Sequence, residues 1–315
     1  MLHVRVVSPT DRSDRVVERL ESDDTVANLV LLRGVARQCG PDGGDLVMFD
    51  LARENANPVL DDLRAMDIER DGSIAFDEAE TVMSHAATRA EKAAPGRPAD
   101  GVIWDAIEAQ VSDDARLSWS FVTFLVLATL IASVGRYLDQ PILIVGAMVV
   151  GPEFAPVAAI CFGLATRSWQ LLRPAAVTLT LGFAAAVAIA TSLWFVAYVA
   201  GWVTQQDAAT GPDTQFIVQP DVWSFIVALL AGTAGVLSMT ASKSGVLVGA
   251  FISVTTVPAI GTVALTVATG VWSEVGSALF QLGINIAGIL LAGTVTLLIQ
   301  RAIWERILTH QRQAH

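Results

Sequence analysis

A single carboxylate stands in the middle of a long uncharged stretch. Glu153 belongs to the run Gly151-Pro152-Glu153-Phe154-Ala155-Pro156, in an apolar segment that begins at Pro141. At about 1.5 Å per residue, a helix from Pro141 carries Glu153 roughly 18 Å along its axis. A carboxylate that deep in a membrane is costly and usually functional. Burial favours its neutral form, so Glu153 either exchanges a proton or a cation, or is a protonated acid that holds a kink.

The residues around Glu153 interrupt the backbone hydrogen-bond ladder of this segment. Pro152 and Pro156 lack amide hydrogens, and Gly146 and Gly151 loosen the chain on the preceding side. Carbonyls and amides freed at membrane depth must face protein or a wet cavity. The sequence therefore predicts a broken helix with a binding or coupling site at the break.

Two later apolar runs add polar groups that could belong to the same site. Thr255 and Thr256 precede Pro258, a second proline predicted to break a helix at mid-membrane, and their hydroxyls can satisfy the freed carbonyls. Gln281 and Asn285 lie in the last run. These amides either line a pathway or only bond across helices.

A candidate calcium site lies near residue 70. Residues 67–78 nearly fit a calcium-binding loop, with oxygen ligands from Asp67, Glu69, Asp71 and Glu78. The third position is Glu, whose longer side chain fits poorly, and the loop has no second copy. We favour the competing prediction, a turn at 71–72 before an edge strand.

No other cluster has the spacing of a metal site, a catalytic triad or a phosphate loop. The four histidines lie far apart in sequence, and the two cysteines, Cys39 and Cys161, fall in different parts of the chain. We therefore expect neither an enzyme nor a resident cofactor.

Charge divides the chain. It has 315 residues, of which 53% are hydrophobic, and a net charge of −11, with a mean hydropathy of +0.54. Most acidic groups precede residue 118, which argues against nucleic-acid binding. We predict a soluble domain at 1–78, a helical linker with a juxtamembrane amphipathic helix at 79–117, a membrane domain at 118–301 and a tail at 302–315.

The sequence of the soluble part predicts an α+β domain. Alternating or β-rich runs predict strands near 2–7, 25–32, 45–51 and 72–76, with helices after the first and third. This order is the ferredoxin-like arrangement. The chain start lacks the apolar core of a signal peptide, so we expect this domain in the cytoplasm.

The membrane part has six segments of crossing length. Gly182, Ala186 and Ala190, in the third, have the spacing that lets helices approach closely. Lys and Arg concentrate on one side of the predicted crossings, so both termini should be cytoplasmic in the plasma (inner) membrane. The segments are 118–137, 141–166, 172–201, 222–241, 245–269 and 276–300.

Two near-repeats link the halves of this part. Trp119-Ser120-Phe121-Val122 matches Trp223-Ser224-Phe225-Ile226, and Val145-Gly146-Ala147-Met148 matches Val248-Gly249-Ala250-Phe251. Each half holds three segments, so the second half should lie inverted. Inverted repeats are a recurring plan of transporters, with sites at broken helices near the midplane.

The runs 145–156, 246–258 and 280–288 resemble three segments of an uncharacterised prokaryotic membrane family, domain-of-unknown-function family 389. Asp71-Gly72-Ser73-Ile74 fits the usual end of that family's cytoplasmic domain, which favours a strand over calcium. The chain departs at Glu153, where many members carry an apolar residue, so a Glu153 site would be particular to one branch. The family has no established activity, so the resemblance leaves function open.

Two function classes follow. The leading hypothesis is a transporter or channel-like protein for a small ion or solute, regulated or assembled by its cytoplasmic domain. The alternative is a non-transporting scaffold or sensor whose soluble domain binds a ligand or partner. Both imply contact with membrane lipid, and we expect a homo-oligomer, with a dimer favoured by symmetry.

Overall fold

The computed structural model describes residues 1–39, 43–79, 82–94, 102–209, 211–219, 221–240 and 246–312. Within these ranges, the side chains of 78, 216, 246–255, 305 and 307–312 are not described. The side-chain roles predicted for Glu78 and Thr255 therefore lie outside the described structure, as does part of the predicted linker, 95–101. The chain divides into two units, residues 1–106 and 107–315.

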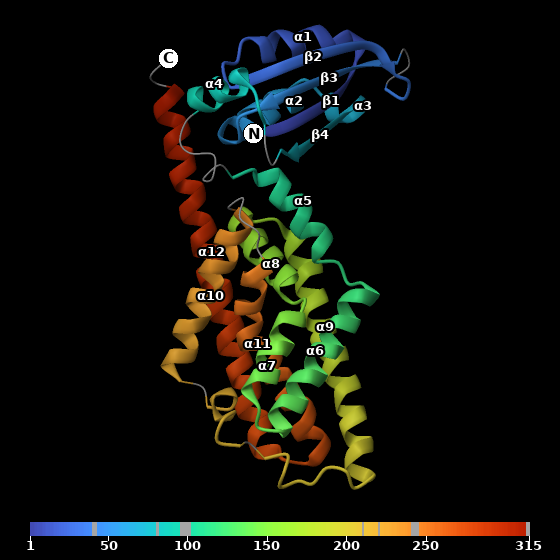
Figure 1. Cartoon of the computed structure of the whole chain (residues 1–315), viewed down its shortest axis with the longest axis vertical. Coiled ribbons are helices and arrows are strands. Elements are labelled where there is room, and N and C mark those ends of the chain that lie inside the picture. The colour runs from blue at the N-terminus through green and yellow to red at the C-terminus, as the bar shows by residue number, and fades with distance from the viewer. Residues whose placement is uncertain are drawn as a thin grey trace. The chain divides into compact units, whose positions relative to one another are not determined.

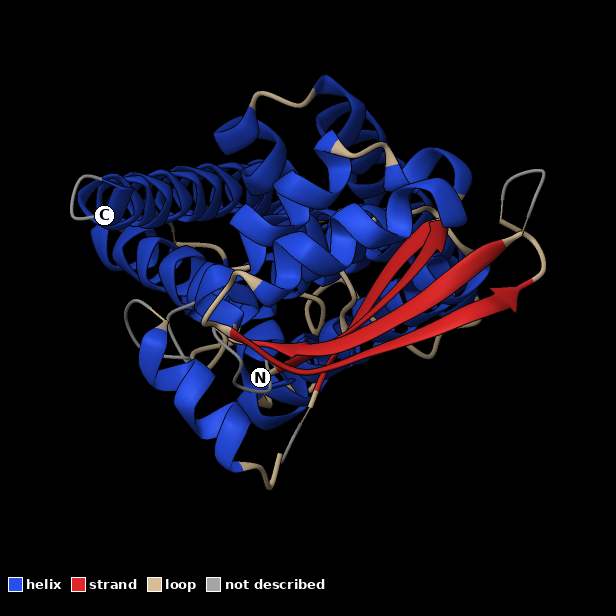
Figure 2. Cartoon of the chain, turned by 90° about the horizontal axis from the view of Figure 1, so that it is seen from above, coloured by secondary structure: helices blue, strands red, loops and turns tan. Residues whose placement is uncertain are grey.

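Unit 1 is built on a sheet of four strands, drawn in red in Figure 2. The strands are β1 (Leu2–Pro9), β2 (Val26–Ala36), β3 (Gly44–Leu51) and β4 (Ser73–Glu78). Their order is β2-β3-β1-β4, and each neighbouring pair is antiparallel. All four lie where the sequence predicted strands.

One face of the sheet forms the core of unit 1. Leu2, Val4 and Val6 alternate along β1 and are at most 1% exposed, because successive strand residues point to opposite faces. They pack with residues of two helices, α1 (Thr10–Glu21) and α2 (Ala56–Ala65), such as Leu20 and Leu63. Along the chain the main elements of this core follow in the order β1-α1-β2-β3-α2-β4.

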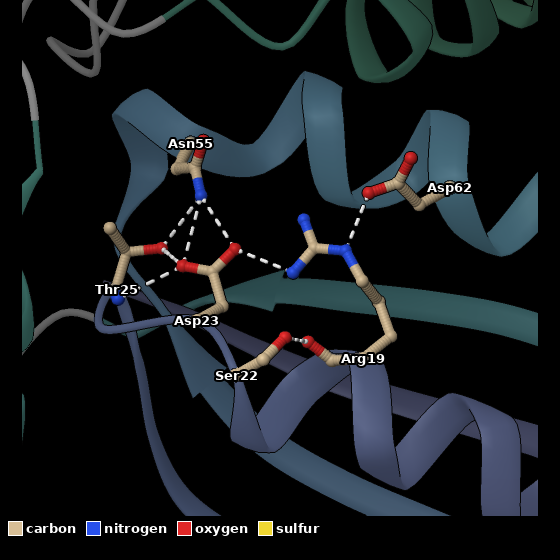
Figure 3. Close-up of polar contacts among 6 residues, drawn as sticks. All are labelled: Arg19, Ser22, Asp23, Thr25, Asn55 and Asp62. Atoms are coloured by element: carbon tan, nitrogen blue, oxygen red, sulfur yellow. Dashed lines mark hydrogen bonds and ion pairs between the residues drawn. The ribbon is translucent and has the colours of Figure 1, made fainter. Parts of the chain in front are cut away.

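A polar cluster fastens the helices to the start of β2 (Figure 3). Asp23 accepts hydrogen bonds from Thr25, Arg19 and Asn55, at 2.6 to 3.2 Å. Arg19 also donates to Asp62 at 2.6 Å. Burial opposes the charged form of Asp23, but the hydrogen bonds outweigh it and lower its pKa. With its groups paired, this cluster is a structural clasp.

The predicted linker is partly incorporated into unit 1. The first helix within the predicted linker is α4 (His85–Ala93), and Ser84 caps its start. It packs against β2 and β3. Asn57 binds the backbone of Val102 and Trp104, so the first residues of α5 (Trp104–Asp114) also belong to unit 1. The boundary at 106–107 thus lies inside α5 rather than at residue 78.

Unit 2 consists of helices joined by short segments and one longer loop (Figure 1). They are α6 (Trp119–Tyr137), α7 (Pro141–Val150), α8 (Phe154–Thr166), α9 (Trp169–Val199), α10 (Val222–Thr240), α11 (Val246–Thr269) and α12 (Trp272–Arg312), with a 3-10 turn η3 (Gln215–Ile217). Among the described residues, α6, α9, α10 and α12 are long and apolar enough to cross a membrane. The bent pair α7–α8 could supply a fifth crossing. Because α12 continues to Arg312, most of the predicted tail is helical.

Small residues set the spacing of these helices. A Cβ added at Gly182 of α9 would lie 2.6 Å from the Phe121 ring of α6. One at Gly232 of α10 would lie 2.5 Å from the Ile289 carbonyl of α12, and Figure 1 shows α10 and α12 side by side. The predicted close approach at Gly182 is therefore confirmed.

Three connecting segments meet at one end of unit 2, which we name the loop end. Asp139, between α6 and α7, accepts hydrogen bonds from the backbone of Asp213 and from Thr214. Gln205 donates to the Gly270 carbonyl at 3.2 Å, next to the end of α11. The segments that follow α6, α9 and α11 thus share one end.

Candidate functional site

The second predicted crossing is broken where the sequence placed the break. α7 ends at Val150 and α8 begins at Phe154, with a bend of 60° between them. Gly151 takes an extended backbone after α7, and Pro152 has no amide hydrogen to continue the helix. The arms have 10 and 13 residues, or roughly 15 and 20 Å at about 1.5 Å per residue, so the break is near mid-segment.

Two neighbouring residues behave differently from the prediction. Pro156 does not break a helix: it lies in the first turn of α8, where backbone amides have no intrahelical partner and proline is tolerated. Gly146 is inside α7, and a Cβ there would meet nothing within 4 Å. The described contacts give no reason for glycine at this position.

Glu153 joins the break to a distant helix. It sits at the start of α8 and is fully buried. Its Oε1 accepts a hydrogen bond from Thr256 Oγ1 of α11 at 2.8 Å. The prediction that the 151–156 break lies close to the Pro258 segment is confirmed by this contact. Counting back from Thr269, Thr256 is roughly 20 Å along α11. The bond therefore joins the middle of α11 to the break between α7 and α8.

The predicted second break at Pro258 was wrong for the described backbone. α11 runs without interruption from Val246 to Thr269. A proline removes one hydrogen bond, but the helix can continue when its neighbours are held by packing, and Val257, Ala259 and Ile260 are at most 1% exposed. The Thr256 hydroxyl also goes to Glu153 rather than to a freed carbonyl.

A cavity of about 440 Å³ opens beside this junction. It brings together the predicted residues Pro258, Gln281 and Asn285, and Pro258 lies two residues beyond Thr256. Gln281 is 6% exposed, and its Oε1 has no hydrogen-bond partner among the described residues. Glu153 does not line it. The lining residues are Gln215, Ile217, Gln219, Asp221, Trp223, Ser224, Val227, Pro258, Ala259, Gln281 and Asn285.

Sequence reasoning missed a buried ion pair at the loop end. Arg136 is fully buried, pairs with the Glu274 carboxylate of α12, and donates to the Ala208 carbonyl at 2.7 Å. The pair ties α6 to α12 and to the loop after α9. Its signal was present: opposite charges stand at the ends of two otherwise uncharged segments.

Two of the described residues of the calcium candidate, Asp71 and Glu69, pair with arginines. Asp67 precedes α3 (Ile68–Asp71) in a left-handed conformation, and β4 begins at Ser73. Asp71 pairs with Arg12 at 3.0 Å and Glu69 with Arg64 at 2.8 Å. Among the described residues, no group of three or more His, Cys, Asp or Glu side chains could hold a metal ion.

These features define a largely helical protein of membrane type that carries a small N-terminal sheet. Residues 148–291 match the model of a domain of unknown function, DUF389. The family resemblance that the motifs at 145–156, 246–258 and 280–288 predicted is therefore confirmed over this range.

A relative in Methanocaldococcus jannaschii, described as an uncharacterized protein, is 28% identical over 184 residues. The match covers 58% of this chain and 55% of the relative, so the chain matches about half the length of that protein. No solved structure matches the chain.

Proposed function

We propose that this chain is a six-crossing membrane protein that moves a small ion or solute past the junction of Glu153 and Thr256. The observation that carries the proposal is their hydrogen bond, 2.8 Å long, at a break in the middle of an apolar helix pair. Beside it lies a cavity with polar walls, formed partly by Gln281 and Asn285. Broken helices with polar groups at mid-depth are where transporters place their sites.

An inverted repeat fits the helix order of unit 2. The matching Trp-Ser-Phe signatures fall at the starts of α6 and α10. α6 ends at Tyr137, just before Asp139 at the loop end, whereas α10 starts at Val222, after the loop segment that Asp139 binds. Equivalent helices thus run in opposite directions, as inversion requires. In this arrangement the pair α7–α8 corresponds to α11. The Glu153–Thr256 hydrogen bond joins the break in that pair to the middle of α11.

The same helix order supports an orientation in the inner membrane. The loop end carries Asp139, Asp207, Asp213 and Asp221, and its one described cation, Arg136, is buried. At the opposite ends of these helices, Arg116 precedes α6, Arg167 lies between α8 and α9, and Arg173 lies near the start of α9. The excess of positive charge would place those segments, and both termini, in the cytoplasm.

Unit 1 would then be a cytoplasmic regulatory or assembly domain. The strand order β2-β3-β1-β4 and its antiparallel pairing support the proposal that this domain is ferredoxin-like. Val30 and Leu32, each 42% exposed, lie on β2. We propose a homodimer, and a monomeric mass in both mild detergent and lipid nanodiscs would contradict it.

One observation favours the alternative of a non-transporting scaffold or sensor. Glu153 is fully buried and does not line the cavity. A dry, packed junction is what a purely structural role for Glu153 would need. The two functions therefore differ in whether the protein carries any flux.

The test is a flux screen of the purified protein in sealed vesicles. Protons, Na⁺, K⁺, small ammonium ions and small anions are compared with empty vesicles and with the Glu153→Leu variant. Flux above both controls for one of these supports transport. No flux for any, from a protein with unchanged helix content and thermal unfolding, supports the scaffold.

A further inference from the structure

We infer that the cavity lined by Gln281 is a binding site for a small organic cation that bears a primary ammonium group. The inference rests on the proposed function for its role in transport, but binding at the site can be tested without it. Three features of the cavity lead to this ligand: a buried acceptor, the sign of the charge and the size of the space.

The buried acceptor is the Gln281 side chain. It is 94% removed from solvent and lines the cavity, and its Oε1 has no hydrogen-bond partner among the described residues. A buried polar atom without a partner is unfavourable, so native sites usually supply one. A ligand that donates an N–H bond in the cavity would satisfy this oxygen.

The charge around the cavity is negative. Asp221 is the one charged lining residue, and Ser224 donates to its Oδ1 from the backbone at 2.7 Å and from the hydroxyl at 2.8 Å. The backbone bond is the main reason that its pKa is lowered, so the carboxylate stays charged. From residue 174 to 300 the sequence has one Lys or Arg, Lys243, which lies outside the described residues. This field attracts cations and repels anions.

The size and walls of the cavity exclude a bare metal ion. A volume of about 440 Å³ with one carboxylate is too large and too poor in anionic ligands for tight ion coordination. Ile217, Val227 and Pro258 supply apolar wall, and Trp223 supplies an aromatic ring. Apolar walls with a few placed polar groups suit an organic ligand, and an indole ring also binds ammonium groups.

The experiment measures binding to the full chain in nanodiscs of phosphatidylcholine. The probes are propylammonium, tetramethylammonium, which has a positive charge but no N–H donor, and propionate, and saturation-transfer NMR reports their binding. We expect propylammonium to bind most tightly and propionate not to bind. Equal binding of all three, or preference for propionate, would overturn the inference.

Variants assign the binding to this cavity. Gln281→Leu removes the acceptor at similar bulk and should weaken propylammonium binding roughly tenfold or more, because hydrogen bonds to charged groups are strong. Gln205→Leu is the matched control, since Gln205 lies at the loop end but not in the cavity. If Gln281→Leu and Gln205→Leu bind propylammonium like the parent chain, the inference fails.

The ammonium group has two possible sources, a free amine or the headgroup of phosphatidylethanolamine. Loss of propylammonium binding in nanodiscs that contain phosphatidylethanolamine would identify the lipid, and unchanged binding would identify a free amine. Both outcomes support an ammonium site. Gln281-dependent binding without flux would contradict transport alone, and flux without such binding would contradict this inference alone.

Discussion

At the scale of single residues, the two proposed functions give different roles to the contact between Glu153 and Thr256. Glu153 comes from the break between α7 and α8, and Thr256 from the middle of α11. A carboxyl group that exchanges a proton here would change its hydrogen bond to Thr256, and with it the link between two helices. A permanently neutral acid would only hold the break in place.

Two substitutions at Glu153 separate these roles. If Glu153 titrates during transport, Glu153→Gln keeps the size and hydrogen bonding, so the protein folds but flux loses its pH dependence. Glu153→Leu should destabilise the fold by about 1–3 kcal/mol, because Thr256 loses its acceptor. Vesicle flux against pH and thermal unfolding check both, with Thr256→Ser as the control that keeps the hydroxyl. A silent Glu153→Gln with normal pH dependence would leave only the structural role.

Glu54 predicts a pH dependence for unit 1. It is fully buried, and neither carboxylate oxygen has a hydrogen-bond partner among the described residues. Burial is the main cause that raises its pKa. Because the folded state favours the neutral acid, the free energy of unfolding is highest below its ordinary pKa and falls as the pH rises through the raised value.

The Glu54→Gln substitution should remove the fall in the free energy of unfolding that Glu54 causes as the pH rises. We expect slower amide exchange in α2 than in the parent chain near pH 7, and a smaller difference near pH 5. Hydrogen-exchange mass spectrometry of the full chain at matched pH measures it. Glu18→Gln, at an exposed position of α1, is the control. An equal effect of Glu54→Gln at both pH values would contradict the prediction.

At the scale of elements, unit 2 depends on close helix pairs made by small residues. α10 and α12 approach until a Cβ at Gly232 would lie 2.5 Å from the Ile289 carbonyl and 2.9 Å from its Cα. These are backbone atoms, which cannot turn aside. The same helix α12 carries Gly283, where an added Cβ meets nothing within 4 Å.

The two glycines should therefore respond in opposite directions to alanine. Gly232→Ala forces the pair apart and should destabilise by about 1–3 kcal/mol. Gly283→Ala should be neutral or stabilise by up to about 1 kcal/mol, because alanine favours the helix more than glycine. Thermal unfolding of both variants in the same detergent measures this, and equal midpoints would contradict the packing argument.

The Asp139 side chain anchors the loop that follows α9. Its carboxylate accepts bonds from the amides of Asp213 and Thr214 and from the Thr214 hydroxyl, at 2.8 to 3.2 Å. The loop goes on to Gln215 and Ile217, which line the cavity. Asp139 therefore positions one wall of the proposed binding site.

Asp139→Asn tests that link. Asn tolerates the positive φ of 50° at this position, but its NH₂ group cannot accept a bond. We expect faster amide exchange across 211–219 with little change in α9 or α12. Asp207→Asn is the control, since Asp207 bonds only locally with Thr204 in the described structure. Unchanged amide exchange across 211–219 would show that the Asp139 carboxylate does not hold the loop.

At the scale of the whole molecule, the proposed inverted repeat with six crossings makes a prediction about membrane topology. The segments at the loop end and the other connecting segments must lie on opposite sides of the membrane. The loop end gathers the segments after α6, α9 and α11, whereas Arg116 and Arg167 lie in connections at the other ends of these helices. An even number of crossings would return the chain to the side where it began.

Cysteine labelling in intact cells tests this topology. Gln206→Cys, in the exposed loop after α9, should react with a membrane-impermeant maleimide from outside. Arg116→Cys, before α6, should react only after the membrane is opened. The native Cys39 and Cys161 are buried, which keeps the background low. The opposite pattern would reverse the orientation, and equal labelling would contradict three crossings between the two positions.

The sequence determined the local features of this protein. Alternation at Leu2, Val4 and Val6 identified β1, because side-chain direction in a strand has a period of two. Gly151 and Pro152 identified the break after α7, because conformational freedom and a missing amide act within a few residues. Helix length and apolar composition identified the membrane-type segments.

Only the tertiary structure decided which distant groups meet. Glu153 and Thr256 are 103 residues apart, and Arg136 and Glu274 are 138 apart. Their pairing depends on how whole helices pack, which no local pattern records. The same packing carries α11 through Pro258, where the sequence predicted a break. Backbone preferences are read over a few neighbours, but a buried polar contact is fixed by the summed packing of helices that bring it together.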